Sequence, residues 1–253
     1  SAACALALSL GLLVVTDSHG RGRAWVHEWD GTRWSEAEEL HAPTTPDINE
    51  YGRSAVVSGD RIVVCCEDRA EAALLWPRAV PITFERVGGS WEVTGHATIP
   101  RPLNLYKGVS NMALDGDRML VGYPLARGEG RVAEFRWIGG EWDWQGDIES
   151  PFSGEFDFGQ RVALFDTTAL VTVGAPSHRR VIVYALVGST WTAKHVVTAT
   201  GDDLLGSVLA IDADRAILSG AGGDRVVVLG RSGSNWSTLA TVAAPAGLEG
   251  YGQ

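Results

Sequence analysis

The chain has 253 residues, of which 45% are hydrophobic and 21% are charged, and it contains 31 glycines. This composition excludes a disordered chain and predicts a well-buried core with many turns. The net charge of -10 creates an overall field that repels nucleic acid and anionic membranes, so we expect no nucleic-acid partner.

Residues 2–15 form an uncharged stretch at the start of the sequence. Its composition is similar to the core of a signal peptide, but no basic segment precedes it and no cleavage pattern follows it. The stretch is also too short to span a bilayer. We therefore expect a buried strand here, with no signal peptide and no membrane insertion.

The three cysteines are Cys4, Cys65 and Cys66. They are too few and too awkwardly spaced for a disulfide framework or a cysteine metal site. Adjacent residues of a strand point to opposite faces, so Cys65 and Cys66 are interpreted as small apolar fillers. The cysteines do not decide between an oxidising and a reducing compartment.

A glycine followed three residues later by a tryptophan recurs along the chain. The tryptophans stand at 34, 91, 142, 191 and 236, so the successive steps are 57, 51, 49 and 45 residues. This spacing is typical of a four-stranded blade of a β-propeller and not of a helical repeat.

Each repeat contains two predicted hairpins. The first, as in "VVSGDRIVVCC" and "LAIDADRAILSGAG", joins two apolar runs through a short Asp/Gly turn. The second, as in "RVIVYALVGSTW", runs from a β-branched strand through a glycine turn to a strand that Trp opens. The stretch 171–191 is accordingly interpreted as scaffold and not as a catalytic loop.

An aromatic residue or Leu followed by Gly opens most units, and it lies at 51–52, 158–159, 205–206 and 251–252. We predict one all-β propeller domain of four-stranded antiparallel blades over residues 1–253. Its repeat units are 1–50, 51–105, 106–157, 158–204 and 205–250, and residues 251–253 start or close a blade. Five blades are expected, and the alternative is a part of a six- or seven-bladed propeller.

The unit from Phe158 to Trp191 resembles the FG-GAP repeat of integrin α chains and of many bacterial surface and secreted proteins. Phe158-Gly159 and Gly174-Ala175-Pro176 stand in the two places that name the repeat. The resemblance covers the chain in about five units, but only this unit carries both motifs intact. It implies a β-propeller of the bacterial, integrin-like type that lies outside the cell or on its surface.

The calcium-binding members of that family carry a DxDxDG-like loop between the two motifs. Calcium takes six to eight oxygen ligands. This chain has only short turns in that place, such as Asp115-Gly116-Asp117 and Asp212-Ala213-Asp214. Asp and Gly suit tight hairpin turns for conformational reasons alone. We therefore expect no metal and no cofactor.

The repeated tryptophans have two interpretations. An indole at the same place in every blade packs between blades and buries a large apolar surface. The alternative is a set of sugar-stacking platforms. We favour packing for Trp34, Trp91, Trp142, Trp191 and Trp236. The better candidates for ligand contact are those of the five other tryptophans that lie on outer strands or loops; the five are Trp25, Trp29, Trp76, Trp137 and Trp144.

We predict no catalytic residue. Asp17, Ser18 and His19 are suitable residue types, but they are adjacent and their side chains are expected to diverge. Loops at one rim of a propeller converge on the central channel, so polar residues there are candidates for ligand binding. The candidate residues are His19, Arg21, Arg23, Arg127, Glu129, His178, Arg179 and Arg180.

The predicted function is a non-enzymatic recognition or scaffold module that binds an unidentified protein or glycan through rim loops. The acidic segment 141–158 offers a second surface, for a basic partner, or else a solvated outer strand and linker. Two alternatives stay open: a carbohydrate-active enzyme with a site in the central channel, and a purely structural assembly unit.

Overall fold

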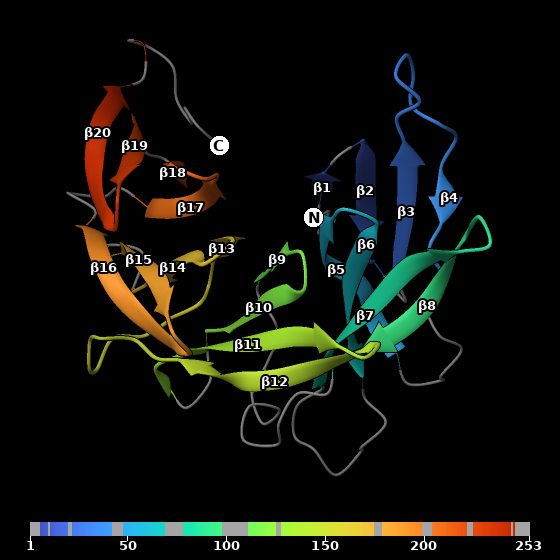
Figure 1. The fold of residues 1–253 in the computed structure, drawn as a ribbon, viewed down its shortest axis with the longest axis horizontal. Coiled ribbons are helices and arrows are strands. Elements are labelled where there is room, and N and C mark those ends of the chain that lie inside the picture. The colour runs from blue at the N-terminus through green and yellow to red at the C-terminus, as the bar shows by residue number, and fades with distance from the viewer. Residues whose placement is uncertain are drawn as a thin grey trace. The chain divides into compact units, whose positions relative to one another are not determined.

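The computed structural model describes residues 6–9, 11–19, 22–41, 48–68, 78–97, 111–124, 128–174, 179–198, 204–221, 225–243 and 245. The strands β1 to β20 form five sheets, and each sheet consists of four strands that are consecutive in the chain (Figure 1). Among these residues, no helix is long and apolar enough to cross a membrane.

The first sheet consists of β1 (Leu6–Ser9), β2 (Leu12–Asp17), β3 (Arg23–Glu28) and β4 (Glu38–Glu39). The second consists of β5 (Ile48–Ser58), β6 (Arg61–Asp68), β7 (Arg78–Val87) and β8 (Ser90–His96). The third consists of β9 (Asn111–Asp115), β10 (Arg118–Tyr123), β11 (Arg131–Ile138) and β12 (Glu141–Ile148). The fourth consists of β13 (Val162–Phe165), β14 (Thr168–Val173), β15 (Arg180–Val187) and β16 (Thr190–Thr198). The fifth consists of β17 (Leu204–Ile211), β18 (Arg215–Ala221), β19 (Arg225–Ser232) and β20 (Asn235–Ala243).

Two-residue turns close the hairpin between the first and second strands in the second and fourth sheets. Ser58 pairs with Arg61 across Gly59-Asp60, and Phe165 pairs with Thr168 across Asp166-Thr167. Gly59 and Asp166 have φ values of 55° and 49°, in the left-handed region that such turns need and that Gly and Asp tolerate. The Asp/Gly turns therefore serve the hairpins, as the sequence predicts.

Burial follows the position of a strand within its sheet. The second strands β10 and β14 are buried at every residue, which explains their continuous apolar runs. The last strands β16 and β20 are largely exposed. The core thus lies on the inner strands, and the last strand is exposed.

A β-bulge recurs between the third and fourth strands of three sheets. It falls between Thr83 and Phe84 in the second sheet, between Val183 and Tyr184 in the fourth, and between Val228 and Leu229 in the fifth. Because a bulge bends a strand and increases its twist, the same irregularity in each sheet indicates that the sheets are copies of one unit.

The uncharged N-terminal stretch forms the hairpin β1–β2, in which Leu6 pairs with Val15 and Ser9 with Leu12. The predicted strand is confirmed, but burial alternates along β2 and Leu8 is exposed, so only one face of the hairpin is covered. Cys65 and Cys66 are both buried and free of disulfides.

The repeated tryptophans do not share one environment. Trp91, Trp142 and Trp236 are 9%, 5% and 5% exposed, as a packing role requires. Trp34 is 40% exposed and contacts Trp29, with ring centroids 5.4 Å apart. The packing interpretation therefore does not extend to Trp34.

The chain falls into two compact units. Unit 1 comprises Ser1–Met119 and Glu134–Gly146, and unit 2 comprises Leu120–Ala133 and Asp147–Gln253. A core cluster of unit 1 includes Tyr51, Phe84 and Trp91. A core cluster of unit 2 is built on the fourth and fifth sheets and includes Leu170 and Trp236.

Replacement of Trp142 by Ala should lower the free energy of unfolding by about 3–5 kcal/mol, because it empties a buried site. It also removes the hydrogen bond that the Trp142 indole N–H donates to Thr83 Oγ1 over 2.7 Å. The matched control is Trp34→Ala, which truncates an exposed indole and should lower that free energy by about 1 kcal/mol or less. Urea unfolding of both variants measures the difference, and equal losses would contradict the assigned environments.

Candidate functional site

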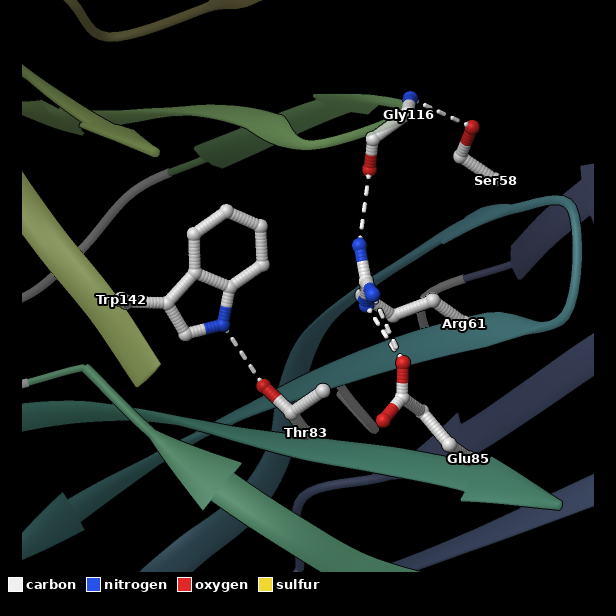
Figure 2. Close-up of polar contacts among 6 residues, drawn as sticks. All are labelled: Ser58, Arg61, Thr83, Glu85, Gly116 and Trp142. Atoms are coloured by element: carbon white, nitrogen blue, oxygen red, sulfur yellow. Dashed lines mark hydrogen bonds and ion pairs between the residues drawn. The ribbon is translucent and has the colours of Figure 1, made fainter. Parts of the chain in front are cut away.

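Two clusters of charged side chains are candidates for a functional site, one in each unit. The cluster in unit 1 surrounds Arg61, the first residue of β6. Its Nε and Nη2 donate to Glu85 Oε1 over 3.0 Å and 2.7 Å, and its Nη1 donates to the carbonyl of Gly116 over 3.1 Å. Figure 2 shows this arrangement, in which Ser58 Oγ also accepts the Gly116 N–H over 2.9 Å.

An open pocket of about 410 Å³ lies beside Arg61, and Glu85 and Arg86 also line it. Both arginines have partners already. The Arg61 guanidinium lies 4.5 Å from the ring centroid of Trp137, and Arg86 pairs with Glu28 and donates to the carbonyl of Gly89. Because Arg61 and Arg86 already donate to groups of the protein, we interpret Arg61 as a structural link between the second and third sheets and not as a ligand site.

The cluster in unit 2 lies where the fourth sheet begins. Three backbone hydrogen bonds join the segment before β13 to the end of β14: Gly174 N–H to Phe156 O over 2.8 Å, Gly159 N–H to Thr172 O over 2.9 Å, and Thr172 N–H to Arg161 O over 3.1 Å. Arg180 pairs with Val173 in the ladder between β14 and β15. Arg179 directly precedes Arg180 and therefore lies at the same end of the sheet, next to residues 156–161.

Arg179 occupies a place that two other sheets, the first and the third, fill with glycine. Gly22 and Gly130 precede the first arginine of β3 and β11, as Arg179 precedes Arg180 of β15. These glycines form parallel bridges to Tyr51 and Phe158, and a Cβ on them would lie 1.7 Å and 2.3 Å from the carbonyl oxygens of those residues. The first and third sheets thus require glycine there, whereas the sequence has Pro77 before Arg78 in the second sheet and Asp224 before Arg225 in the fifth.

The Arg179 side chain is buried, and one of its donors has no partner. The residue is 7% exposed, and its Nε atom has no hydrogen-bond acceptor. Burial lowers the pKa of Arg179 below its usual value, the carboxylate of Asp157 opposes this shift, and the positive charge of Arg161 adds to it. Asp157 and Arg161 are therefore each within electrostatic reach of Arg179.

Arg161 and Asp157 are held by their own segment. Arg161 donates from Nε to the carbonyl of Ser207 over 3.2 Å and from Nη1 to the carbonyl of Gln160 over 3.5 Å. Asp157 is half-buried and has a φ of 61°, and its carbonyl accepts the Gln160 N–H over 3.2 Å. A non-glycine residue in this conformation is uncommon, and such residues gather at functional sites.

The neighbouring charges of unit 2 are paired among themselves. Arg180 forms an ion pair with Glu155, and its guanidinium lies 4.7 Å from the ring centroid of Phe152. Arg131 forms an ion pair with Glu149. Two carboxylates of the acidic segment 141–158 are therefore used within the protein, which leaves fewer of them for a basic partner.

The predicted binding residues are divided between the two units and the part of the chain that the structure does not describe. Arg21, Arg127 and His178 lie outside the described residues, and so do Ala175 and Pro176 of the scaffold motif. His19 and Arg23 belong to unit 1, whereas Glu129, Arg179 and Arg180 belong to unit 2. Of the predicted residues that the structure describes, Arg179 is the one whose environment indicates a ligand.

Asp17 and His19 are in contact, contrary to the expectation that their side chains diverge. The Asp17 carboxylate accepts the His19 backbone N–H over 2.9 Å and lies 3.1 Å from His19 Nδ1. The hydrogen bond from the His19 backbone N–H is the main cause that holds the pKa of Asp17 below its usual value. The hydrogen bond with the His19 ring lowers this pKa further. Both groups are exposed, as expected of a turn. In the described part of the chain, no three His, Cys, Asp or Glu side chains lie close enough together to hold a metal ion.

The sequence did not single out Asp157 and Arg161. Arg161 joins the cluster through the carbonyl of Ser207, which lies 46 residues further along the chain. A signal for Arg179 was present, since alignment of the units places Arg where Gly22 and Gly130 stand. The burial that makes this departure informative is not visible in one sequence.

No protein-family model and no curated protein matches the chain. Several solved structures are similar to it. The periplasmic gluconolactonase PpgL of Pseudomonas aeruginosa is 13% identical, with a TM-score of 0.53 over 96% of this chain and 86% of that chain. YjhT is 12% identical, with a TM-score of 0.55 over 95% and 84%. A prolyl endopeptidase is 16% identical, with a TM-score of 0.57 over 94% of this chain but only 34% of that chain.

The fold is therefore a β-propeller, as the repeats predict, with five four-stranded sheets as its blades. The narrower resemblance to FG-GAP repeats stays a prediction. The expectation of a non-enzymatic recognition or scaffold module is wrong, because a gluconolactonase and a prolyl endopeptidase, which are enzymes, are among the proteins of similar structure.

Arg61→Met should lower the free energy of unfolding by about 2–4 kcal/mol, because it leaves Glu85 and the carbonyl of Gly116 without their charged donor. Arg61→Lys keeps the positive charge but loses the planar set of guanidinium donors, so we expect a smaller fall in the free energy of unfolding. Urea unfolding measures both. An Arg61→Met variant as stable as the wild type would show that the contacts of Arg61 with Glu85 and Gly116 contribute nothing to the free energy of unfolding.

Proposed function

We propose that the protein is a hydrolase that opens a small sugar lactone, with Asp157, Arg161 and Arg179 as its site. The observation that carries this proposal is the buried Arg179 guanidinium, which has no hydrogen-bond acceptor at Nε and lies within reach of one carboxylate and a second guanidinium. The likeness to a periplasmic gluconolactonase over nearly the whole chain supports it. By the same likeness we propose a location outside the cytoplasm.

Lactone hydrolysis needs the charges that this cluster offers. A water oxygen attacks the lactone carbonyl carbon while a base removes a proton from the water. The carbonyl oxygen then carries negative charge until the ring C–O bond breaks, and the ring oxygen takes a proton to become a hydroxyl group. The product is a hydroxy acid. A fixed cation beside the carbonyl oxygen stabilises the intermediate, and such groups typically account for a large share of catalysis.

Each residue of the cluster has a role in this reaction. Asp157 is the general base that takes the proton from water. Arg161 stabilises the oxyanion, because its contacts with the carbonyls of Ser207 and Gln160 fix the guanidinium before the substrate arrives. Arg179 adds positive charge in a place that water reaches poorly, where the attraction to a developing anion is strongest.

The cluster suits water activation better than peptide hydrolysis through a covalent intermediate. Its described members are a carboxylate and two guanidinium groups, and covalent acyl transfer needs a nucleophile with an adjacent base. The match to the prolyl endopeptidase also spans only 34% of that chain. We therefore favour the lactone over the peptide as substrate.

Asp157→Asn should lower kcat for the δ-lactone of gluconic acid by about 100-fold or more, because it removes the base. The matched control is Asp166→Asn, which changes another aspartate of unit 2 with a positive φ, 49° against 61°, in a hairpin turn. Asn tolerates both conformations, so both variants should fold.

The rate is followed by acid release in a weakly buffered indicator assay, with spontaneous hydrolysis subtracted. The control should retain the wild-type rate. A folded wild-type protein that gives no rate above the spontaneous one, or an Asp157→Asn variant with full activity, would overturn the proposal.

A further inference from the structure

The last strand of each sheet has a free edge. In the described part of the chain, β4, β8, β12, β16 and β20 each pair with one neighbouring strand only. Such an edge presents N–H and C=O groups that can pair with another chain, and charged side chains on the strand commonly prevent this. The strand β20, with the sequence NWSTLATVA, has no charged residue. The other four strands carry charges: Glu38 and Glu39 in β4, Glu92 in β8, Glu141, Asp143 and Asp147 in β12, and Lys194 in β16.

One equivalent position shows this difference directly. The bulges of β8, β16 and β20 leave Thr94, Lys194 and Leu239 without a paired residue on the preceding strand. Each of these residues follows the repeated tryptophan of its strand by three positions. A bulge and a lysine both protect an edge strand from pairing. The fourth sheet therefore has both protections at this position, whereas the fifth has the bulge and an apolar residue.

The strand β20 is exposed along its length apart from one residue. Trp236 is 5% exposed, whereas Leu239 and Val242 are 56% and 43% exposed, and the other residues of the strand are exposed too. The Leu239 side chain lies against Gly230, where an added Cβ would lie 2.4 Å from Leu239 Cδ1. The exposed run 237–243 contains no proline and no charge. Runs of six or seven such residues with high β-propensity pair readily with one another.

The missing charge favours a second copy of this strand as its partner. Antiparallel pairing about a twofold axis places a strand opposite itself, so a charge on one copy lies near the same charge on the other. Like charges on paired strands are destabilising. Self-pairing of β12 would bring the carboxylates of Glu141, Asp143 and Asp147 close to those of a second copy. Self-pairing of β20 meets no such repulsion, and the backbone groups of both copies supply the hydrogen bonds.

We propose that two copies of the protein associate through β20, with the two strands antiparallel and the two fifth sheets joined into one continuous sheet. This association goes beyond the proposed hydrolysis and does not depend on it. A contact along one strand buries little surface compared with a permanent dimer interface, so we expect a dissociation constant in the micromolar range. Each copy has a net charge of -10, so salt that screens the repulsion between the copies strengthens the dimer.

Sedimentation velocity of the wild-type protein between about 1 µM and about 1 mM tests the association. The weight-average mass should rise with concentration towards twice that of one chain. Leu239→Lys places in β20 the residue that β16 has at its bulge, and the aliphatic part of the lysine still covers Gly230. Leu239 is the middle residue of the strand, so two lysines then face each other across the contact. The dissociation constant should rise by about 10-fold or more.

Ser237→Lys and Thr192→Lys form a matched pair that separates the strand from the added charge. Each of the two residues is exposed and directly follows the repeated tryptophan of its strand. Ser237→Lys in β20 should weaken the dimer as Leu239→Lys does, and it keeps the test decisive if Leu239→Lys fails to fold. Thr192→Lys in β16 should leave the dissociation constant within about twofold of the wild-type value, because β16 lies outside the contact.

Hydrogen exchange of the wild-type protein identifies the segment in contact. Residues 235–243 should exchange more slowly at high than at low protein concentration, because the amides of the free edge become hydrogen-bonded. Residues 190–198 of β16 should exchange at the same rate at both concentrations. A wild-type protein that stays monomeric over the whole range, a dimer that Thr192→Lys weakens as much as the lysines in β20 do, or a dimer without slower exchange in β20 would overturn the proposal.

Discussion

An arginine that is buried between β-strands must be paired, since a guanidinium removed from water without a counter-charge is strongly unfavourable. The rule holds through much of this protein. Arg61 meets Glu85, Arg118 meets Glu134 at 2.9 Å, and Arg131 and Arg180 meet glutamates of the acidic segment. The first two pairs join neighbouring strands, and the last two join a strand to the segment between β12 and β13. Arg179 departs from the rule, because none of the ion pairs among the described residues joins it to a carboxylate, and the functional account depends on that departure.

The repeat explains why the departure stands out. Each blade is built from the same two hairpins, and the third strand of each begins with arginine. The residue before that arginine is glycine where the backbone of the following segment approaches closely, as at Gly22 and Gly130. The place is not constant among the blades, since Pro77 and Asp224 stand there in the second and fifth. An arginine stands there in the fourth blade alone.

Hairpins, strand order and blade spacing were predictable from the sequence because they rest on local signals. Asp/Gly turns such as Gly59-Asp60 and the alternation of apolar residues act within a few residues. The environment of Trp34 was not predictable, because burial depends on which surface lies opposite. Asp157 and Arg161 were missed for a similar reason: their meeting with Arg179 requires the segment before β13 to lie against the end of β14, through contacts such as that of Gly174 with Phe156.

The unpaired state of Arg179 is the central claim, and the stability of Arg179→Met tests it most directly. Replacing a paired buried arginine by an apolar residue of similar length removes a favourable contact and leaves the partner charge without a counter-charge. Replacing an unpaired one removes a desolvation penalty instead. We predict that urea unfolding without ligand gives Arg179→Met a free energy of unfolding equal to or above that of the wild type. A fall of about 2 kcal/mol or more would show that Arg179 already has a partner within the protein and would contradict the account.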